Sequence, residues 1–226
     1  MKNEIQQELK KLMCIPGDAS SDEIKEVFDK VAKEIFTNYH INKNGEEYYF
    51  LEIEFYFCNK KHPDIITYPR DMDACRWFFH KSGIDLTFQS SYSRFEGKDG
   101  MVDVNHNFAF GGILIRKILK KNTGQSIDGP NKCEWELFDN FDAFGTIKNE
   151  YPILERNKKT LDVTYSTSRR TFSYSKNDEK MKKKYDELNH KVFADNVPAS
   201  RERFCEFIQK ELFAYEVEKE HMVSKL

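Results

Sequence analysis

Residues 47–70 read EYYFLEIEFYFCNKKHPDIITYPR, and the first half of this stretch alternates in the way a β-strand does. One side of that strand carries Tyr49, Leu51, Ile53, Phe55 and Phe57, and the other carries Phe50, Glu52, Glu54 and Tyr56. The first set is predicted to face the core. The second set places two carboxylates between aromatic side chains, where a protein either pairs a charge or uses it. Glu54 is therefore either a functional carboxylate or a buried structural one, and the strand alone leaves both interpretations open.

The composition is typical of one soluble domain spanning 1–226. The chain is long enough for a substantial core, and 39% of its residues are apolar. No apolar run approaches the ~20 residues of a membrane span, so no membrane association is expected. The N-terminus MKNEIQQELKKLMC does not resemble a signal peptide. Five scattered cysteines without CxxC spacing predict neither a disulfide framework nor a metal site. We expect a cytoplasmic protein with no metal or cofactor, and a monomer is favoured.

The charge balance limits the possible partners. A formal net charge of −2 is not that of a strongly basic nucleic-acid binder. Any contact with nucleic acid is therefore predicted to come from a local cationic patch.

Periodicity and turn residues predict helices at 2–13, 20–39, 133–144, 176–188 and 201–217. Strands are predicted at 47–58, 77–79, 84–88, 111–118 and within 160–174. The second helix opens with a capping box, from Ser20 to Glu23. Turn or loop is predicted for 40–45, 59–76 and 89–107, the last with one short strand. Trp135, Leu137, Phe138 and Phe141 are expected to point inward. The lysines of 176–188 are interpreted as a solvated helix face, with phosphate binding as the alternative.

Six short blocks follow one another in a recognisable order. They are Glu52-Ile53-Glu54-Phe55-Tyr56, Tyr68-Pro69-Arg70, Trp77-Phe78-Phe79 with Gly83, Gly112-Ile113-Leu114-Ile115-Arg116, Gly129-Pro130-Asn131-Lys132, and residues 192–200. These blocks resemble E-T-E-A-Y, T-P-R, Y-V-Y…Y-G, V-L-L-R-A, G-P-x-K and R-F-Y-x-x-G-x-P-x-V-S of the alkyladenine (methylpurine, or 3-methyladenine) DNA glycosylases. The resemblance covers 48–201 and leaves the helices of 1–40 outside. It implies a mixed α/β (α+β) domain, with a curved antiparallel sheet and surrounding helices.

The resemblance also implies an activity, the base excision repair of DNA that contains alkylated or deaminated purines. Such an enzyme is a monofunctional hydrolase that flips the damaged base out of the duplex and leaves an abasic site. Glu54 would activate the water, with Glu52 as a weaker candidate, and Arg116 would lie beside Glu54 and keep it ionised. A plain buried ion pair is the alternative for Arg116. The rival function is an inactive or repurposed protein of this fold that binds nucleic acid or another ligand.

The resemblance further implies how the base is held. Tyr56, His62 and Phe79 match the residues that sandwich the extruded base, and Gln89 falls where the family has an asparagine that selects against guanine. Ordinary aromatic core residues, and for His62 a loop histidine, are the alternative interpretation.

DNA contact is predicted from the cations around this site and from the hairpin. The cations are Lys60, Lys61, Arg70, Arg76 and Lys81. Ser82 stands where the family has an aromatic wedge that enters the duplex, so the usual intercalating side chain is missing, unless Met72 or His80 replaces it.

Overall fold

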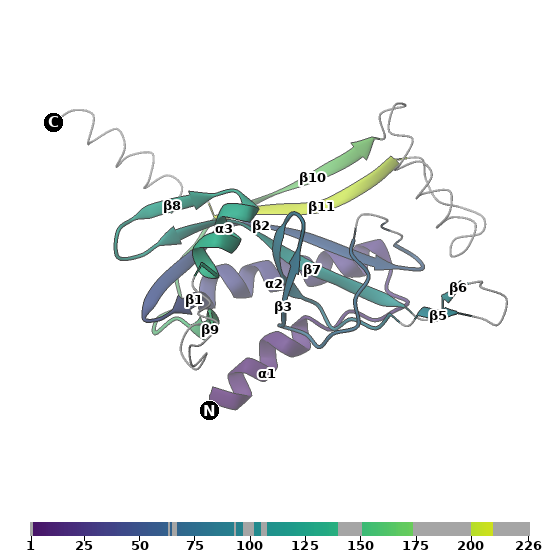
Figure 1. Cartoon of the computed structure of the whole chain (residues 1–226), viewed down its shortest axis with the longest axis horizontal. Helices are drawn as coiled ribbons and strands as arrows, with labels where there is room; N and C mark the ends of the chain where they lie inside the picture. The colour runs from purple at the N-terminus through teal and green to yellow at the C-terminus, as the bar shows by residue number, and fades with distance from the viewer. Residues whose placement is uncertain are drawn as a thin grey trace.

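The computed structural model describes residues 2–62, 64, 67–92, 94–96, 102–104, 108–139, 151–173 and 200–209 (Figure 1). The chain forms a mixed α/β domain in which a curled antiparallel sheet, a half-barrel, packs against few helices. The helices are α1 (Lys2–Leu12), α2 (Ser21–Asn38) and α3 (Pro130–Leu137). The fold class predicted from the sequence is thus confirmed at this level.

In the described part of the chain, nine strands make the main sheet. They are β1 (Tyr39–Lys43), β2 (Glu46–Asn59), β3 (Trp77–His80), β4 (Gly83–Thr87), β7 (Ala109–Lys120), β8 (Gln125–Asp128), β9 (Ile153–Arg156), β10 (Tyr165–Ser173) and β11 (Ser200–Gln209). The order along the sheet is β10-β11-β2-β7-β4-β3, while β1 pairs with β2 and β9, and β8 pairs with β7. Strands β5 (Arg94–Glu96) and β6 (Val102–Val104) form a separate hairpin, so the loop of 89–107 holds two short strands where one was predicted.

Strand β2 lies at the centre of the sheet, but it does not alternate throughout. Its register with β7 shifts between Phe50 and Glu52 and again between Glu52 and Ile53. Tyr48 and Phe50 are buried before the shift, whereas Tyr49 is only half-buried. Placing Tyr49 in the core was therefore wrong, although the other four residues of that set are buried. The irregularity allows β2 to pair first with β1 and then, at residues 52–54, with β11.

Helix α2 supplies the other half of the core. Its capping box is confirmed, because the Ser20 side chain accepts from the Glu23 backbone and the Glu23 side chain accepts from the Ser20 backbone. The Phe28 ring stacks on Phe55 of β2 at 4.6 Å between centroids and also contacts Phe88. Because β2 and α2 are joined by these large buried rings, the strand that carries Glu54 is rigidly held from behind.

Three sequence predictions need correction. Residues 201–209 form β11 and not a helix, because pairing with β2 satisfies backbone groups that the central strand would otherwise leave unpaired. The helix expected at 133–144 begins at Pro130, after Gly129 with φ of 115°, and ends at Leu137, while Trp135 is 64% exposed. Residues 39–43 form β1, although 40–45 was predicted to be a turn, and β8 and β9 were not foreseen.

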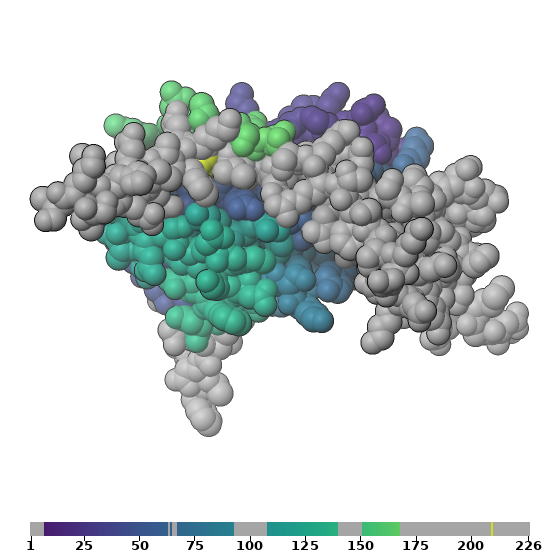
Figure 2. Space-filling model, turned by 90° about the horizontal axis from the view of Figure 1, so that it is seen from above, coloured from purple at the N-terminus to yellow at the C-terminus, as the bar shows by residue number. Residues whose placement is uncertain are grey.

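The helices α1 and α2, the β3–β4 hairpin, β7 and β10 match their predictions within a few residues. Residues 140–144, 176–188, 192–199 and 210–217 lie outside the described ranges. On the side of the molecule seen in Figure 2, residues 108–139 form one continuous patch, drawn in teal. No helix in the described part of the chain has the length and apolar character needed to cross a membrane.

Candidate functional site

One side of the sheet carries polar side chains where the other side carries the core. Glu54 of β2 pairs with Leu114 of β7, Leu114 pairs with Asp85 of β4, and Asp85 pairs with Phe78 of β3. Directly opposed residues of antiparallel strands project to the same side, so these four side chains share one face. We call this side the polar face; it carries Glu52, Glu54, Tyr56, Phe78, His80, Asp85 and Arg116. It lies opposite to the side on which Phe55 packs against α2.

Arg116 joins the two carboxylates of β2. Its Nη1 lies 2.5 Å from Glu54 Oε2, and its Nε lies 2.7 Å from Glu52 Oε1. The Glu54 side chain is 2% exposed, whereas Glu52 and Arg116 are 16% and 24% exposed. The expected proximity of Arg116 to Glu54 is thus present, and one cation is shared between a buried and a more accessible carboxylate. Charge-assisted hydrogen bonds of this kind fix the orientation of both partners.

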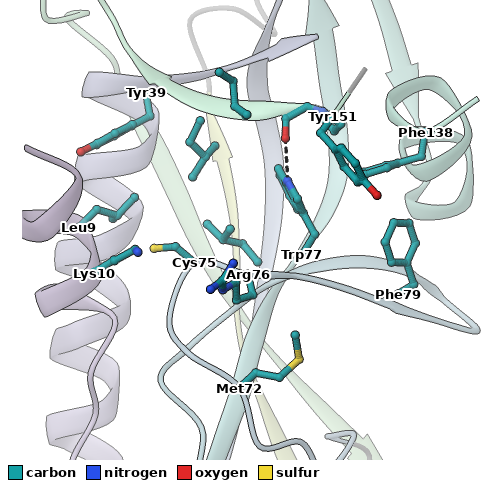
Figure 3. Close-up of a pocket in the computed structure, with 14 residues that line it drawn as sticks. Leu9, Lys10, Tyr39, Met72, Cys75, Arg76, Trp77, Phe79, Phe138 and Tyr151 are labelled. Atoms are coloured by element: carbon teal, nitrogen blue, oxygen red, sulfur yellow. Dashed lines mark hydrogen bonds between the residues drawn. The ribbon is translucent and has the colours of Figure 1, made fainter. Parts of the chain in front are cut away.

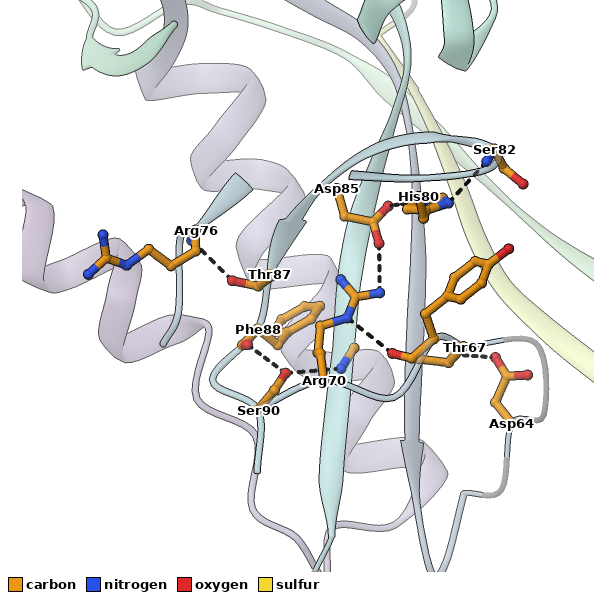
Figure 4. A network of polar contacts seen from close by, with 12 residues as sticks. Asp64, Thr67, Arg70, Arg76, His80, Ser82, Asp85, Thr87, Phe88 and Ser90 are labelled. Atoms are coloured by element: carbon orange, nitrogen blue, oxygen red, sulfur yellow. Dashed lines mark hydrogen bonds and ion pairs between the residues drawn. The ribbon is translucent and has the colours of Figure 1, made fainter. Parts of the chain in front are cut away.

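A second ionic cluster lies on the same face, built from a loop arginine and the hairpin (Figure 4). Arg70 Nη2 lies 2.9 Å from Asp85 Oδ2, and His80 Nε2 lies 2.9 Å from Asp85 Oδ1. The Arg70 guanidinium also covers the Phe78 ring at 3.8 Å from its centroid. Burial lowers the pKa of Arg70, and Asp85 and then Tyr56 oppose that effect. This cluster was not predicted, although an aspartate inside the apolar run Ile84-Asp85-Leu86 was a signal for it.

Gly112 makes room for the Arg70 guanidinium. A Cβ at this position would lie 2.8 Å from Arg70 Nη1 and 2.8 Å from Asp85 Oδ2. Since Gly112 is directly opposite Tyr56 on β2, the absent side chain lets Arg70 reach across β7 toward that tyrosine.

The hydrogen bonds of His80 assign its tautomer. Nδ1 accepts from the backbone N–H of Ser82 at 3.2 Å, so Nε2 carries the proton and donates to Asp85. Both ring nitrogens are thus used within the protein. The ring itself lies beside Tyr68, with centroids 4.9 Å apart and the ring planes tilted by 34°, and Tyr68 is 38% exposed. Tyr68 is a flat, accessible aromatic surface that sequence reasoning did not single out.

The structure distributes the four predicted base-binding residues over different places, and only Tyr56 lies beside Glu54 on the polar face. Tyr56 is half-buried on the polar face, two residues after Glu54. Phe79 lies on the opposite side of the sheet, 4.7 Å from Phe138 between centroids. His62, in the loop after β2, is buried against the first residue of α2, and its Nδ1 lies 2.9 Å from Ser21 Oγ. Gln89 follows the hairpin, and its side chain accepts a hydrogen bond at 3.1 Å from the backbone N–H of Ala74, which lies in the loop before the hairpin.

The predicted DNA-contacting cations also divide into two groups. Arg70 cannot reach a phosphate here, because its side chain is 1% exposed and paired with Asp85; that assignment needs correction. Lys60, Lys61 and Lys81 are exposed, and so is Ser82 in the turn of the hairpin. Arg76 is exposed too, and its Nη2 lies 3.8 Å from Asp73.

Within the described residues, no three His, Cys, Asp or Glu side chains are grouped closely enough to hold a metal ion. The polar face offers carboxylates, Arg116, Tyr56 and His80, with Arg70 paired to Asp85 from the loop.

Comparison with known proteins adds one relative. No family model matches the chain, and no solved structure matches it. The chain is 26% identical over 144 residues to an uncharacterized protein of Acanthamoeba polyphaga mimivirus. The match covers 58% of this chain and 65% of the viral protein, so it spans less than two thirds of that relative's length. The viral protein's name states no activity, and the glycosylase-like fold stays a prediction.

Proposed function

We propose that this protein hydrolyses N-glycosidic bonds and releases alkylated or deaminated purines from DNA. The observation that carries the proposal is the Glu54–Arg116–Glu52 bridge on the polar face. A carboxylate on the central strand, oriented by a guanidinium and supported from behind by α2, has the rigidity that a water-activating group requires. The order of the sequence blocks around it supports the choice of substrate.

In the proposed reaction Glu54 accepts a proton from a water molecule. The water oxygen forms a bond to the sugar C1′, the C1′–N bond breaks, and its electron pair leaves with the purine. General-base assistance of this kind typically contributes about 10²–10⁴ in rate. Arg116 holds the Glu54 carboxylate in one orientation, and Glu52 holds Arg116 from the other side. No covalent lysine intermediate is involved.

We assign the base-facing surfaces to Tyr56 and Tyr68. Both are associated with Arg70, because the Tyr68 carbonyl accepts from Arg70 Nε at 3.1 Å and Tyr56 is close enough to affect its pKa. Flat aromatic faces replace the stacking that an extruded base loses, about 1–3 kcal/mol per base. Tyr68 takes the place given to Phe79 in the sequence-based prediction, since Phe79 points to the other side of the sheet.

A second candidate is a non-catalytic protein that binds nucleic acid or another ligand. One observation favours it: the Glu54 side chain is 2% exposed and ion-paired, as a purely structural carboxylate would be. The net charge of −2 agrees with a weak contact to DNA.

Strand scission by hot alkali separates the two candidates. Oligonucleotides containing hypoxanthine or ethenoadenine would be incubated with the wild-type protein and with Glu54→Gln, purified identically so that contaminating glycosylases appear in both. Base release by the wild type alone supports the hydrolase. Equal release by both proteins, or binding of the oligonucleotide without release by either, contradicts it.

A further inference from the structure

We propose that the pocket on the other side of the hairpin is a second ligand site, for a planar aromatic molecule that carries an anionic group. The pocket has a volume of about 500 Å³ and lies between α1, strand β3 and the segment that enters β9 (Figure 3). Phe79 and Trp77 face it, whereas Phe78 and His80 of the same strand belong to the polar face. The site is therefore separate from Glu54, and the proposal does not rest on the hydrolase.

The walls of this pocket are aromatic. Trp77 and Phe79 both meet the Phe138 ring edge to face, at 5.9 and 4.7 Å between centroids. The Trp77 Nε1–H is already used, because it donates to the Pro152 carbonyl at 2.8 Å. Phe79 and Tyr151 are each 47% exposed. Ring faces that remain accessible favour a flat aromatic guest over a flexible alkyl chain.

One end of the pocket is cationic. Lys10 and Arg76 lie near Cys75, at the end away from Phe79 and Phe138 (Figure 3). The lining that the structure describes for this pocket includes no carboxylate. Arg76 Nη2 lies 3.8 Å from Asp73 Oδ2, and both side chains are more than half exposed, so this pairing is weak. An anionic group on the guest would have two cations available to it.

The backbone that positions these residues is strained. Cys75 adopts φ of 63°, a conformation that a non-glycine residue rarely takes. Hydrogen bonds with Thr87 keep it there, because Cys75 N–H donates to the Thr87 carbonyl at 2.9 Å and Arg76 N–H donates to Thr87 Oγ1 at 3.0 Å. Strain of this kind is found where a ligand site needs a fixed geometry. The left-handed conformation of Cys75 directs the next two residues, Arg76 and Trp77, to the pocket.

Fluorescence titration tests the site directly. The chain has two tryptophans, and Trp135 does not line the pocket, so Trp135→Phe leaves Trp77 as the only tryptophan reporter. The probes are 8-anilinonaphthalene-1-sulfonate, an aromatic anion made of two flat ring systems, and its neutral counterpart N-phenyl-1-naphthylamine. We expect the anion to bind one saturable site and to quench Trp77. Arg76→Gln removes one charge-assisted contact. It should raise the dissociation constant of the anion about tenfold, and that of the neutral probe less than about twofold.

Variants of the walls and of a remote cation complete the test. Phe79→Ala and Tyr151→Ala should each raise the dissociation constants of both probes about fivefold or more. Two wall variants are used so that the test still stands if one of them does not fold. Lys132→Gln removes an exposed cation outside the pocket and should leave both dissociation constants unchanged. The proposal is overturned if no saturable site is found, if the wall variants bind both probes like the wild type, or if Arg76→Gln weakens the two probes equally.

Discussion

Arg70 and Asp85 form an ion pair in which both side chains are 1% exposed, with 2.9 Å between Nη2 and Oδ2. Removing one partner leaves the other charge buried, so we expect Arg70→Met to lower the free energy of unfolding by about 3–5 kcal/mol. The double variant Arg70→Met/Asp85→Leu should lose less than the sum of the two single changes, because no lone charge remains. Urea denaturation followed by circular dichroism measures all three.

The matched control for this ion pair is Arg76→Met. Arg76 is an exposed arginine six residues further along the chain, with a weak partner at 3.8 Å, so the change should alter stability by less than about 0.5 kcal/mol. A loss below about 1 kcal/mol for Arg70→Met would show that the buried pair does not contribute as described.

The carboxylates of β2 should differ in their effect on activity. Glu54→Gln keeps the shape of the side chain but cannot accept the proton of a water, so base release should fall by about 10²–10⁴. Glu52→Gln, which weakens only the support of Arg116, should have a smaller effect. Single-turnover release from a hypoxanthine oligonucleotide measures both. A Glu54→Gln rate within about threefold of wild type would remove Glu54 from the catalytic role.

The core was predictable where local pattern and burial agree. Ile53, Phe55 and Phe57 alternate and are buried, and the α2 periodicity places Phe28 against them. The irregularity at Phe50–Ile53 was not predictable, because it arises where β2 changes partner from β1 to β11. The same pairing overrides the helical spacing of residues 201–209, since strand partners far apart in sequence leave no local signal.

The candidate site was predictable only along single strands. Glu54 and Tyr56 share a face because they are two residues apart, and a resemblance suggested that Arg116 lies near them. Arg70 was interpreted as a surface cation, since nothing in the loop sequence shows that Gly112 leaves space for it beside Asp85. Phe79 was placed with Tyr56 by analogy, although the period of strand β3 decides which of Phe78 and Phe79 reaches the polar face.

Desolvation of its thiol should make the half-buried Cys75 slow to alkylate. Desolvation raises the pKa of the Cys75 thiol to about 12, so at pH 8 only about one molecule in 10⁴ carries the thiolate. Because the thiolate is the reactive form, the alkylation rate of Cys75 should rise about tenfold per pH unit between pH 7 and 10. Iodoacetamide labelling with peptide mass spectrometry gives the rate at each site.

Cys14 is the internal reference for that experiment. It is exposed, so it should be labelled well before Cys75 and before the buried Cys133, whose thiol pKa burial also raises to about 12. Labelling of Cys75 as fast as that of Cys14 at pH 8 would contradict the raised pKa of the Cys75 thiol.

The turn of the β3–β4 hairpin offers a test of how DNA would be engaged under the proposed function. Ser82 is exposed there and uses its backbone N–H to hold His80, so a larger side chain can be introduced without losing that bond. Extruding a base from a duplex costs a few kcal/mol, and an inserted aromatic side chain recovers part of it by filling the gap. A serine hydroxyl cannot do this. The wild-type protein should therefore prefer lesions in single strands, mismatches or frayed ends over lesions in intact duplex.

Ser82→Tyr should restore a wedge and improve the processing of duplex. Stacking worth about 1 kcal/mol or more corresponds to at least about a fivefold higher rate on duplex, with little change on single strands. Ser82→Ala, which adds no aromatic ring, is the matched control and should behave like the wild type. The measurement compares base-release rates on matched single- and double-stranded lesion oligonucleotides for the three proteins. If the wild type already prefers fully paired duplex and Ser82→Tyr leaves the ratio unchanged, another side chain of the hairpin loop acts as the wedge, and Ser82 does not occupy the position that the resemblance gives it.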